Sequence, residues 1–211
     1  MRCRTRVLQT LVRLAHPPSP PLPIRTSLSI STFHSFTPAG QTWARDLDAD
    51  LIRLRDHFGV TTVACLLNDA ELRSLKVRDY ADVVRSHNVQ YVNLPMIEMA
   101  APDDFHEAAA FIDDLRRRVD EAGEVLAVHC KGGIGRAGLV AACVLLATGQ
   151  MARADEAIAE VRRRRCKTAV ETSRQEDFVA KYEAWLRRGG GAGGEGRGGG
   201  GGKCGDGGGG T

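Results

Sequence analysis

Apolar positions in the middle of this chain follow two spacings, and each predicts a different kind of element. Short continuous apolar runs indicate buried strands, whereas apolar residues that recur every three or four positions indicate amphipathic helices. Continuous runs predict strands at 28–33, 60–67, 90–94 and 124–128. Helical spacing predicts helices at 43–58, 70–75, 80–87, 102–121, 135–148, 153–165 and 172–188.

Strands that alternate with helices form a mostly parallel sheet, because each parallel connection crosses over through a helix. The pattern therefore predicts a single α/β domain over residues 28–188. We expect a three-layer architecture in which a mostly parallel central sheet is flanked by helices. Open sheets of this kind bind ligands at the carboxyl ends of their strands.

The two ends of the 211-residue chain differ from its middle. Residues 1–45 contain no Asp or Glu, and a proline-rich run at 17–23 excludes a helix there. We expect residues 1–27 to be a disordered basic extension, and their acid-free, amphipathic start also fits an organelle transit peptide. Residues 189–211 are mostly glycine, which predicts a flexible tail. No stretch approaches the ~20 apolar residues of a membrane span. We expect a cytoplasmic protein, or a mitochondrial or plastid one if residues 1–27 are a transit peptide.

Charge and cysteine spacing narrow the function classes. The net charge of +3 is modest, and the arginine run 162–165 ends a predicted helix, where cations favour the dipole and their heads reach solvent. We therefore expect no nucleic-acid partner. The six cysteines include no Cys-x-x-Cys pair, which argues against a zinc site and a disulfide framework.

A cysteine, a glycine-rich run and an arginine separate the strand predicted at 124–128 from the helix predicted at 135–148. At such a junction the loop amides converge at the positive end of the helix dipole and form a cradle for a phosphate-like anion. The amides and a nearby guanidinium favour the thiolate of Cys130, which is the nucleophilic form. Arg136 offers two donors that match two phosphate oxygens. The segment therefore predicts phosphoryl transfer to Cys130. The expected phosphate-binding residues are Lys131, Gly132, Gly133, Ile134, Gly135 and Arg136.

The spacing differs from that of two common glycine-rich loops. A dinucleotide site needs Gly-x-Gly-x-x-Gly and an acidic residue on the next strand, and a Walker loop ends in Gly-Lys followed by Ser or Thr. Here Lys131 precedes the glycines. A tight turn with a buried cysteine is the remaining alternative, but a plain turn would not need His129, Cys130 and Arg136 together.

His129-Cys130, five residues and then Arg136 resemble the signature of the cysteine-dependent protein tyrosine and dual-specificity phosphatases. The glycines of this loop are most similar to those of the kinase-associated phosphatase branch. Segments at 43–47, 94–95, 101–103 and 169–176 resemble that branch in order and spacing. The resemblance covers roughly residues 28–186 and implies a protein tyrosine phosphatase-like fold of dual-specificity size, without a metal or cofactor. It also implies hydrolysis of phosphotyrosine, and of phosphoserine or phosphothreonine, through a phosphocysteine.

In this family an aspartate protonates the leaving oxygen, and the corresponding position here is Glu98. A glutamate can act as a general acid, but its extra methylene moves the carboxyl by about a bond length. Asp103 and Asp104 are alternatives. Pro102, Asp103 and Asp104 also suit the first turn of the predicted helix, where proline and acids are favoured.

Four further residues have a candidate role. Ala137 stands where many family members carry Ser or Thr, and the missing hydroxyl implies slow breakdown of the phosphocysteine. Gln175 matches a family glutamine near the phosphate loop, where an amide can orient water, although Thr172 to Gln175 also has a capping-box pattern. We expect His129 to support the loop by hydrogen bonding. Cys65 is either a small core residue or the partner of Cys130 in a protective disulfide.

Two classes of function follow. The first is a monomeric phosphatase that acts on a phosphorylated protein, with protein kinases among its partners. The second is a slow or inactive phosphatase-like module that binds phosphorylated proteins, motivated by Glu98 and Ala137. A phosphoinositide or an RNA 5′-phosphate is the alternative substrate, because the depth of the pocket sets the substrate class. Lys131 adds positive charge beside the cradle, which favours a phosphoinositide or simply strengthens phosphate binding.

Overall fold

The computed structural model describes residues 12–13 and 46–190. Its sheet has four strands in the order β1-β4-β2-β3. The strands are β1 (Val12–Arg13), β2 (Thr62–Cys65), β3 (Gln90–Asn93) and β4 (Val125–His129). β2 pairs in parallel with both β3 and β4, whereas β1 pairs antiparallel with β4. The strand predicted at 28–33 lies outside the described residues, as do most of the 1–27 extension and residues 191–211 of the tail.

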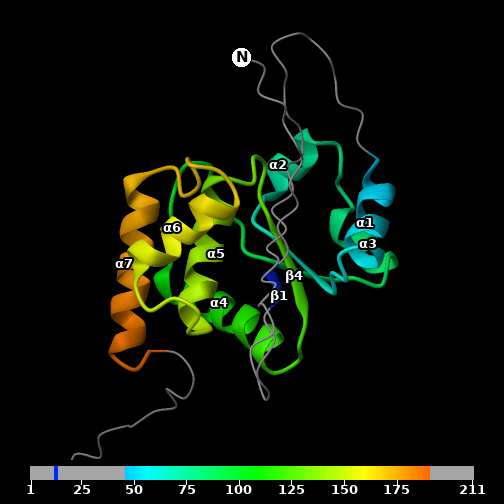
Figure 1. The fold of residues 1–211 in the computed structure, drawn as a ribbon. Helices are drawn as coiled ribbons and strands as arrows, with labels where there is room; N and C mark the ends of the chain where they lie inside the picture. Colours follow the sequence, from blue (N-terminus) through cyan, green and yellow to red (C-terminus); the bar gives the residue numbers. More distant parts are fainter. Residues whose placement is uncertain (1–11, 14–45, 191–211) are drawn as a thin grey trace, which may run out of the picture.

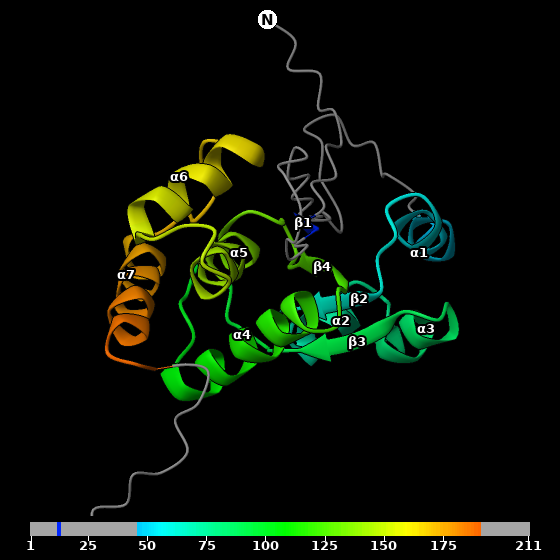
Figure 2. The ribbon, with the colours of Figure 1, turned by 60° about the horizontal axis from the view of Figure 1, so that its bottom comes forward.

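The helices cover both faces of the sheet, as predicted. They are α1 (Leu47–Asp56), α2 (Asp69–Ser74), α3 (Tyr80–Ser86), α4 (Phe105–Asp120), α5 (Gly135–Ala147), α6 (Ala154–Arg164) and α7 (Ser173–Arg187). Figure 1 shows α1 and α3 on one side of β4 and α4 to α7 on the other. The second view, in Figure 2, keeps this separation. The chain thus folds as an α/β domain with a mostly parallel sheet between two layers of helices.

The centre of the core is the pair formed by β4 and α5. All five residues of β4 are buried, which explains why the strand reads as a continuous apolar run. α5 is buried on every side because it packs against β4, α4, α6 and α7. The loop between β4 and α5 therefore connects two elements that are enclosed by the rest of the domain.

Helix ends follow the capping residues. Asp46 caps α1, Asn68 caps α2 and Thr172 caps α7 through their side chains. The helix predicted from Pro102 begins only at Phe105, so the prediction that Pro102 and Asp103 form its first turn was wrong. Asp104 is the N-cap, and its Oδ1 accepts from the amides of His106 and Glu107 at 2.8 and 3.0 Å.

No helix in the described part of the chain is both long and apolar enough to cross a membrane.

Candidate active site

The phosphate loop, residues 130–136, leaves the carboxyl end of β4 and runs into α5. Gly133 has a left-handed backbone, with φ of +62°, which glycine adopts without a steric penalty. This turn directs the Gly133 amide at the cysteine, and the amide donates a hydrogen bond of 3.2 Å to Cys130 Sγ. α5 begins at Gly135, so its positive dipole end lies at the same loop. Backbone groups therefore stabilise negative charge on the sulfur.

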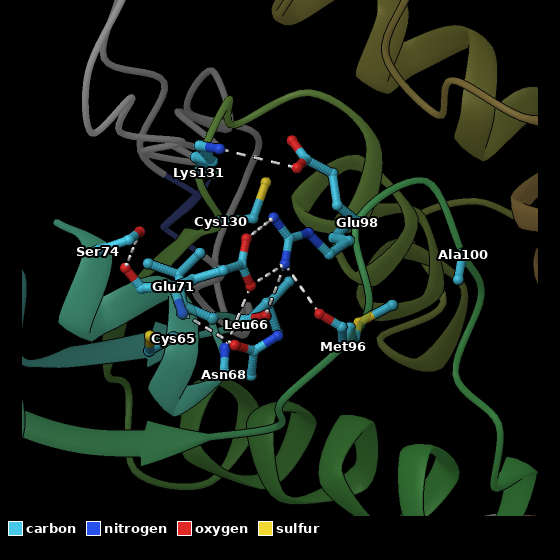
Figure 3. Close-up of polar contacts among 12 residues, drawn as sticks. Cys65, Leu66, Asn68, Glu71, Ser74, Met96, Glu98, Ala100, Cys130 and Lys131 are labelled. Carbon is cyan, nitrogen blue, oxygen red and sulfur yellow. Dashed lines mark hydrogen bonds and ion pairs between the residues drawn. The ribbon is translucent and has the colours of Figure 1, made fainter.

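Arg136 lies in the first turn of α5, as predicted, and its guanidinium is fixed from several sides. Nη1 donates to the carbonyls of Leu66 and Met96 at 3.3 and 2.8 Å. Glu71 accepts from both ends of the fork, at 2.7 Å from Nη1 and 2.8 Å from Nη2. Figure 3 shows Glu71 reaching from α2 toward the phosphate loop. Arg136 is only 2% exposed, so its direction is set before any phosphate binds.

Glu71 was missed by the sequence analysis. Its carboxylate also accepts from the Asn68 amide in the capping box of α2. Burial acts to raise the pKa of Glu71, but the hydrogen bonds from Arg136 and Asn68 and the nearby cations outweigh burial and lower it. Glu71 is therefore ionised at neutral pH and balances the buried charge of Arg136.

His129 is buried directly before the nucleophile. Its Nε2 lies 3.0 Å from the Tyr80 hydroxyl. Burial lowers the pKa of His129 to about 4, despite a hydrogen bond with the Cys130 backbone that acts to raise it. The imidazole is thus neutral at physiological pH, in agreement with a supporting role rather than proton transfer.

The three acid candidates lie in different surroundings. Glu98 lies beside the mouth of the loop, where its Oε2 is 3.8 Å from Lys131 Nζ (Figure 3). Asp104 is occupied by its capping bonds, which hold the pKa of its carboxyl below the ordinary value. Asp103 is exposed. Of the three, only Glu98 is in contact with a residue of the phosphate loop through an ion pair that the structure records.

Residues 165–175, here called the bridging segment, connect the phosphate loop to the loop that carries Glu98. Arg165 Nε donates to the Gly133 carbonyl at 3.0 Å, and the Val170 amide donates to the Ile134 carbonyl at 3.3 Å. At the other end, Thr172 Oγ1 donates to Met99 O at 3.3 Å and Gln175 Nε2 donates to Ala100 O at 3.0 Å. The bridging segment therefore fixes the distance between nucleophile and candidate acid.

Gln175 lies at the phosphate loop, as the resemblance implied, but both ends of its amide have protein partners. Besides its bond to Ala100, its Oε1 accepts from the Glu171 amide at 2.9 Å. The Thr172 hydroxyl accepts from the Gln175 amide at 3.3 Å, so Thr172 is the predicted N-cap, but the reciprocal bond of the predicted capping box is not formed, because Gln175 Oε1 is bound to the Glu171 amide. Gln175 is completely buried, so its side chain acts first as a structural link.

The arginine run 162–165 does end a helix, and Arg163 is exposed as predicted, but Arg162, Arg164 and Arg165 are only partly exposed and have protein partners. Arg162 donates to the carbonyls of Ala169 and Val170 and pairs with Glu176. Arg163 and Arg164 pair with Glu160, one turn earlier on α6. Through Arg162, which holds Ala169 and Val170, and Arg165, which binds Gly133, the end of α6 anchors the bridging segment.

The cysteines of the described residues are free thiols at 65, 130, 143 and 166. Cys65 is completely buried and pairs in register with His129, next to the nucleophile. Burial raises the pKa of the Cys65 thiol to about 11, so it behaves as a small core residue. Among the residues that the structure describes, no three His, Cys, Asp or Glu side chains gather as a metal ion would require.

The junction of β4 and α5 thus combines a thiol, a fixed guanidinium and a backbone amide directed at the sulfur. This is the arrangement that a cysteine-dependent phosphatase needs, and a family model supports the same assignment. The model of the PTP-SAK family, described as "Swiss Army Knife protein, DSP-PTPase phosphatase domain", matches residues 42–179. The chain belongs to this family. Its domain is therefore a phosphatase domain of the dual-specificity type, as the signature around Cys130 suggested.

Individual proteins similar to this PTP-SAK domain share about a quarter of its residues. Cyclin-dependent kinase inhibitor 3 from Sus scrofa is 25% identical over 138 residues, which cover 65% of this chain and 64% of the pig protein. The protein of the same name from Homo sapiens is 24% identical over 124 residues, covering 59% and 58%. The chain thus spans less than two thirds of these curated relatives.

Solved structures show the same fold. Kinase associated phosphatase, with serine in place of its catalytic-site cysteine, superposes with a TM-score of 0.70 at 19% identity, covering 87% of this chain and 98% of that one. Tk-PTP in its active form gives a TM-score of 0.58 at 24% identity, covering 75% and 90%.

Proposed function

We propose that this protein is a phosphatase that hydrolyses phosphotyrosine, and also phosphoserine or phosphothreonine, on proteins through a phosphocysteine on Cys130. The observation that carries this proposal is the convergence of the Gly133 amide on Cys130 Sγ with the fixed guanidinium of Arg136. The sulfur is the nucleophile of such a site, and the guanidinium binds two non-bridging oxygens of the phosphate.

The first half of the reaction transfers the phosphoryl group to sulfur. The Cys130 thiolate attacks phosphorus, the bond from phosphorus to the leaving oxygen breaks, and Glu98 gives that oxygen a proton. Lys131 pairs with Glu98, and its exposed position lets it turn toward a phosphate. The residues that would bind the phosphate are Lys131, Gly132, Gly133, Ile134, Gly135 and Arg136.

The second half returns the thiolate. Water attacks the phosphocysteine, the phosphorus–sulfur bond breaks, and inorganic phosphate leaves. Ala137 is completely buried and offers no hydroxyl to the departing sulfur, so we expect this half to limit turnover. Gln175 supports this step by holding its neighbours at the loop.

Hydrolysis of a small aryl phosphate by the wild type and by Cys130→Ser tests the proposal. We expect turnover that depends on Cys130, together with a phosphorylated cysteine after acid quench. The matched control is Cys166→Ser, which changes a thiol outside the phosphate loop. Equal rates for wild type and Cys130→Ser would overturn the mechanism.

The buried Ala137 and the Lys131–Glu98 ion pair favour a second candidate, a slow or inactive domain that captures phosphorylated proteins. Capture of a phosphopeptide by the wild type without turnover would support it. A phosphoinositide or an RNA 5′-phosphate is the third substrate class, and side-by-side rates on these and on a phosphotyrosine peptide would rank the three.

The relatives named above suggest the partner and the setting. Because they are named for kinases, we propose a phosphorylated protein kinase as the first substrate to test, with this chain acting as a monomer. We also propose residues 28–188 as the phosphatase domain, 1–27 as an extension and 189–211 as a tail.

We propose a cytoplasmic location, because a catalytic thiol stays reduced in the reducing cytoplasm. A fluorescent fusion would show whether residues 1–27 direct the chain to a mitochondrion or plastid instead.

A further inference from the structure

Besides Glu71 and Glu98, a third carboxylate lies directly on the phosphate loop, away from Lys131. Gly135 is the first residue of α5, and a methyl group added there would collide with Glu171 Oε2. It would also approach both amide atoms of Gln175, at 3.1 Å. The Glu171 carboxylate therefore rests against the backbone of the loop where Gly135 leaves room for it. Glu171 is also exposed, so solvent water reaches it.

The position of Glu171 is held by its backbone. Its amide donates to Gln175 Oε1 at 2.9 Å, and Gln175 is completely buried. The preceding residue, Val170, is bound through its amide to the Ile134 carbonyl and has a left-handed backbone with φ of +59°. That conformation is unfavourable for a β-branched residue and is kept only where neighbours impose it. The main chain before Glu171 is thus tied to the phosphate loop, whereas the residue after it, Thr172, is tied through its hydroxyl to Met99 of the loop that carries Glu98.

A carboxylate at this place opposes phosphate binding. The amides of the loop and the dipole of α5 attract an anion, and a second negative charge beside Gly135 repels a phosphate dianion. Such a carboxylate contributes nothing to substrate affinity, but it can accept a proton. The two carboxylates are also separated along the loop, since Glu98 approaches at Lys131 and Glu171 at Gly135.

We propose that Glu171 is the base of the second half-reaction, an inference that rests on the phosphocysteine mechanism proposed above. Glu171 takes a proton from the attacking water as the water oxygen bonds to phosphorus. The phosphorus–sulfur bond breaks, its electron pair returns to Cys130 as the thiolate, and inorganic phosphate leaves. Gln175 is then a positioning residue, which holds the backbone of Glu171. Glu98 serves the leaving group in the first half, so the two proton transfers use different carboxylates.

Rapid-mixing kinetics of Glu171→Gln on an aryl phosphate test this assignment. We expect the burst of the first turnover to keep its rate, while steady-state turnover falls by about 100-fold. Acid quench should show phosphorylated Cys130 accumulating. Formate should restore part of the turnover of Glu171→Ala, because a small carboxylate replaces the missing base. Asp177→Asn, which changes an exposed carboxylate on α7, is the matched control and should behave as the wild type.

Three results separate the alternatives. An unchanged steady-state rate with a lower KM would mean that Glu171 only repels phosphate, and would overturn the proposal. A burst that slows in parallel with turnover would place Glu171 in the first half or in the fold, and would overturn it as well; Glu171→Asp, which keeps the charge, should retain the burst. Absence of any Cys130-dependent burst in the wild type would instead defeat the proposed function itself.

Discussion

Glu71 holds the guanidinium of Arg136 at both ends of its fork, with hydrogen bonds of 2.7 and 2.8 Å. Removing the carboxylate leaves a buried cation whose remaining partners are neutral carbonyls. We expect Glu71→Ala to lower the free energy of unfolding by about 3 kcal/mol, because a buried charge loses its counter-ion. We also expect kcat/KM for an aryl phosphate to fall by about 100-fold as Arg136 loses its direction.

Urea unfolding and steady-state kinetics check the two effects of Glu71. Glu71→Gln keeps the shape and one acceptor, so its losses should be smaller than those of Glu71→Ala. Glu107→Ala changes an exposed glutamate on α4 and should stay within about 0.5 kcal/mol of the wild type. If Glu71→Ala were as stable and as active as Glu107→Ala, the Glu71–Arg136 ion pair would contribute to neither stability nor catalysis.

Replacing Glu98 should lower kcat/KM most for substrates whose leaving group needs a proton. For Glu98→Gln we expect kcat/KM on an alkyl or phenyl phosphate to fall by about 100-fold, and much less on a nitrophenyl phosphate, whose leaving group departs unprotonated. Stability should hardly change, because the ion pair with Lys131 is exposed. Asp103→Asn and Asp104→Asn are the matched comparisons, and asparagine preserves the N-cap of α4. A larger loss in either of these than in Glu98→Gln would move the acid to that residue.

Replacing Gln175 should lower both the stability of the protein and its kcat. Gln175→Ala removes the bonds to Ala100 O and to the Glu171 amide from a completely buried position. We expect a loss of about 2 kcal/mol in the free energy of unfolding and at least a tenfold loss of kcat, because the loop of Glu98 and the backbone of Glu171 both lose an anchor. Denaturant unfolding and rapid mixing measure the two. Thr172→Ser keeps its hydroxyl and should retain the rate; wild-type kcat in Gln175→Ala would contradict the positioning role.

The free energy of unfolding should decrease as the pH is lowered, because His129 is buried in its neutral form. Its pKa is about 4 in the folded protein, where burial disfavours the charged form, and 6.5 in the unfolded chain. Between these values the unfolded chain binds a proton that the folded protein does not, so the free energy of unfolding decreases as pH falls from 6.5 to about 4. The full effect is on the order of 3 kcal/mol. Glu71, whose folded pKa is lowered, adds a further loss once the pH falls below its ordinary value of 4.5.

Urea unfolding at several pH values between 7 and 4 measures this slope. His129→Gln should flatten it above pH 4.5, whereas His106→Gln, an exposed histidine of α4, should leave it unchanged. An identical slope in wild type and His129→Gln would assign the acid sensitivity to other groups.

Ala137→Ser should speed the return of the thiolate. A hydroxyl at this position is placed one residue after Arg136, and we expect kcat to rise about threefold to tenfold with a smaller accumulation of phosphocysteine. Ala142→Ser adds a hydroxyl at another completely buried site of α5 and should lower stability without raising kcat. Equal kcat for Ala137→Ser and the wild type would show that thiolate departure does not limit the cycle.

The fold was accessible from the sequence because its elements have regular apolar spacing. Cys130 and Arg136 were accessible because they share one short motif. Glu71 was not, since it lies 65 residues from Arg136 and its local pattern, Asn68 followed three residues later by Glu71, indicates only a helix start. The start of α4 was misplaced because Pro102 suits a first turn, whereas the side chain of Asp104 fixes the N-cap two residues later.

The arginine run shows a similar limit. A cation at the end of a helix is favourable in any context, so the sequence alone cannot reveal that Arg162 and Arg165 also bind carbonyls of distant turns. Long side chains reach partners that follow from the tertiary arrangement rather than from spacing.

The hydrogen bonds that link the bridging segment to the two loops, as described above, go to main-chain oxygens, those of Gly133, Ile134, Met99 and Ala100. Carbonyl oxygens are present whatever side chain a residue carries. The side chains of Ile97 and Glu98 can therefore be exchanged without removing these acceptors, whereas Met99 has a left-handed backbone, with φ of +64°, that restricts its replacements. Ile97, which is 62% exposed, is thus a position where substrate preference can be redesigned while the reaction centre is left intact.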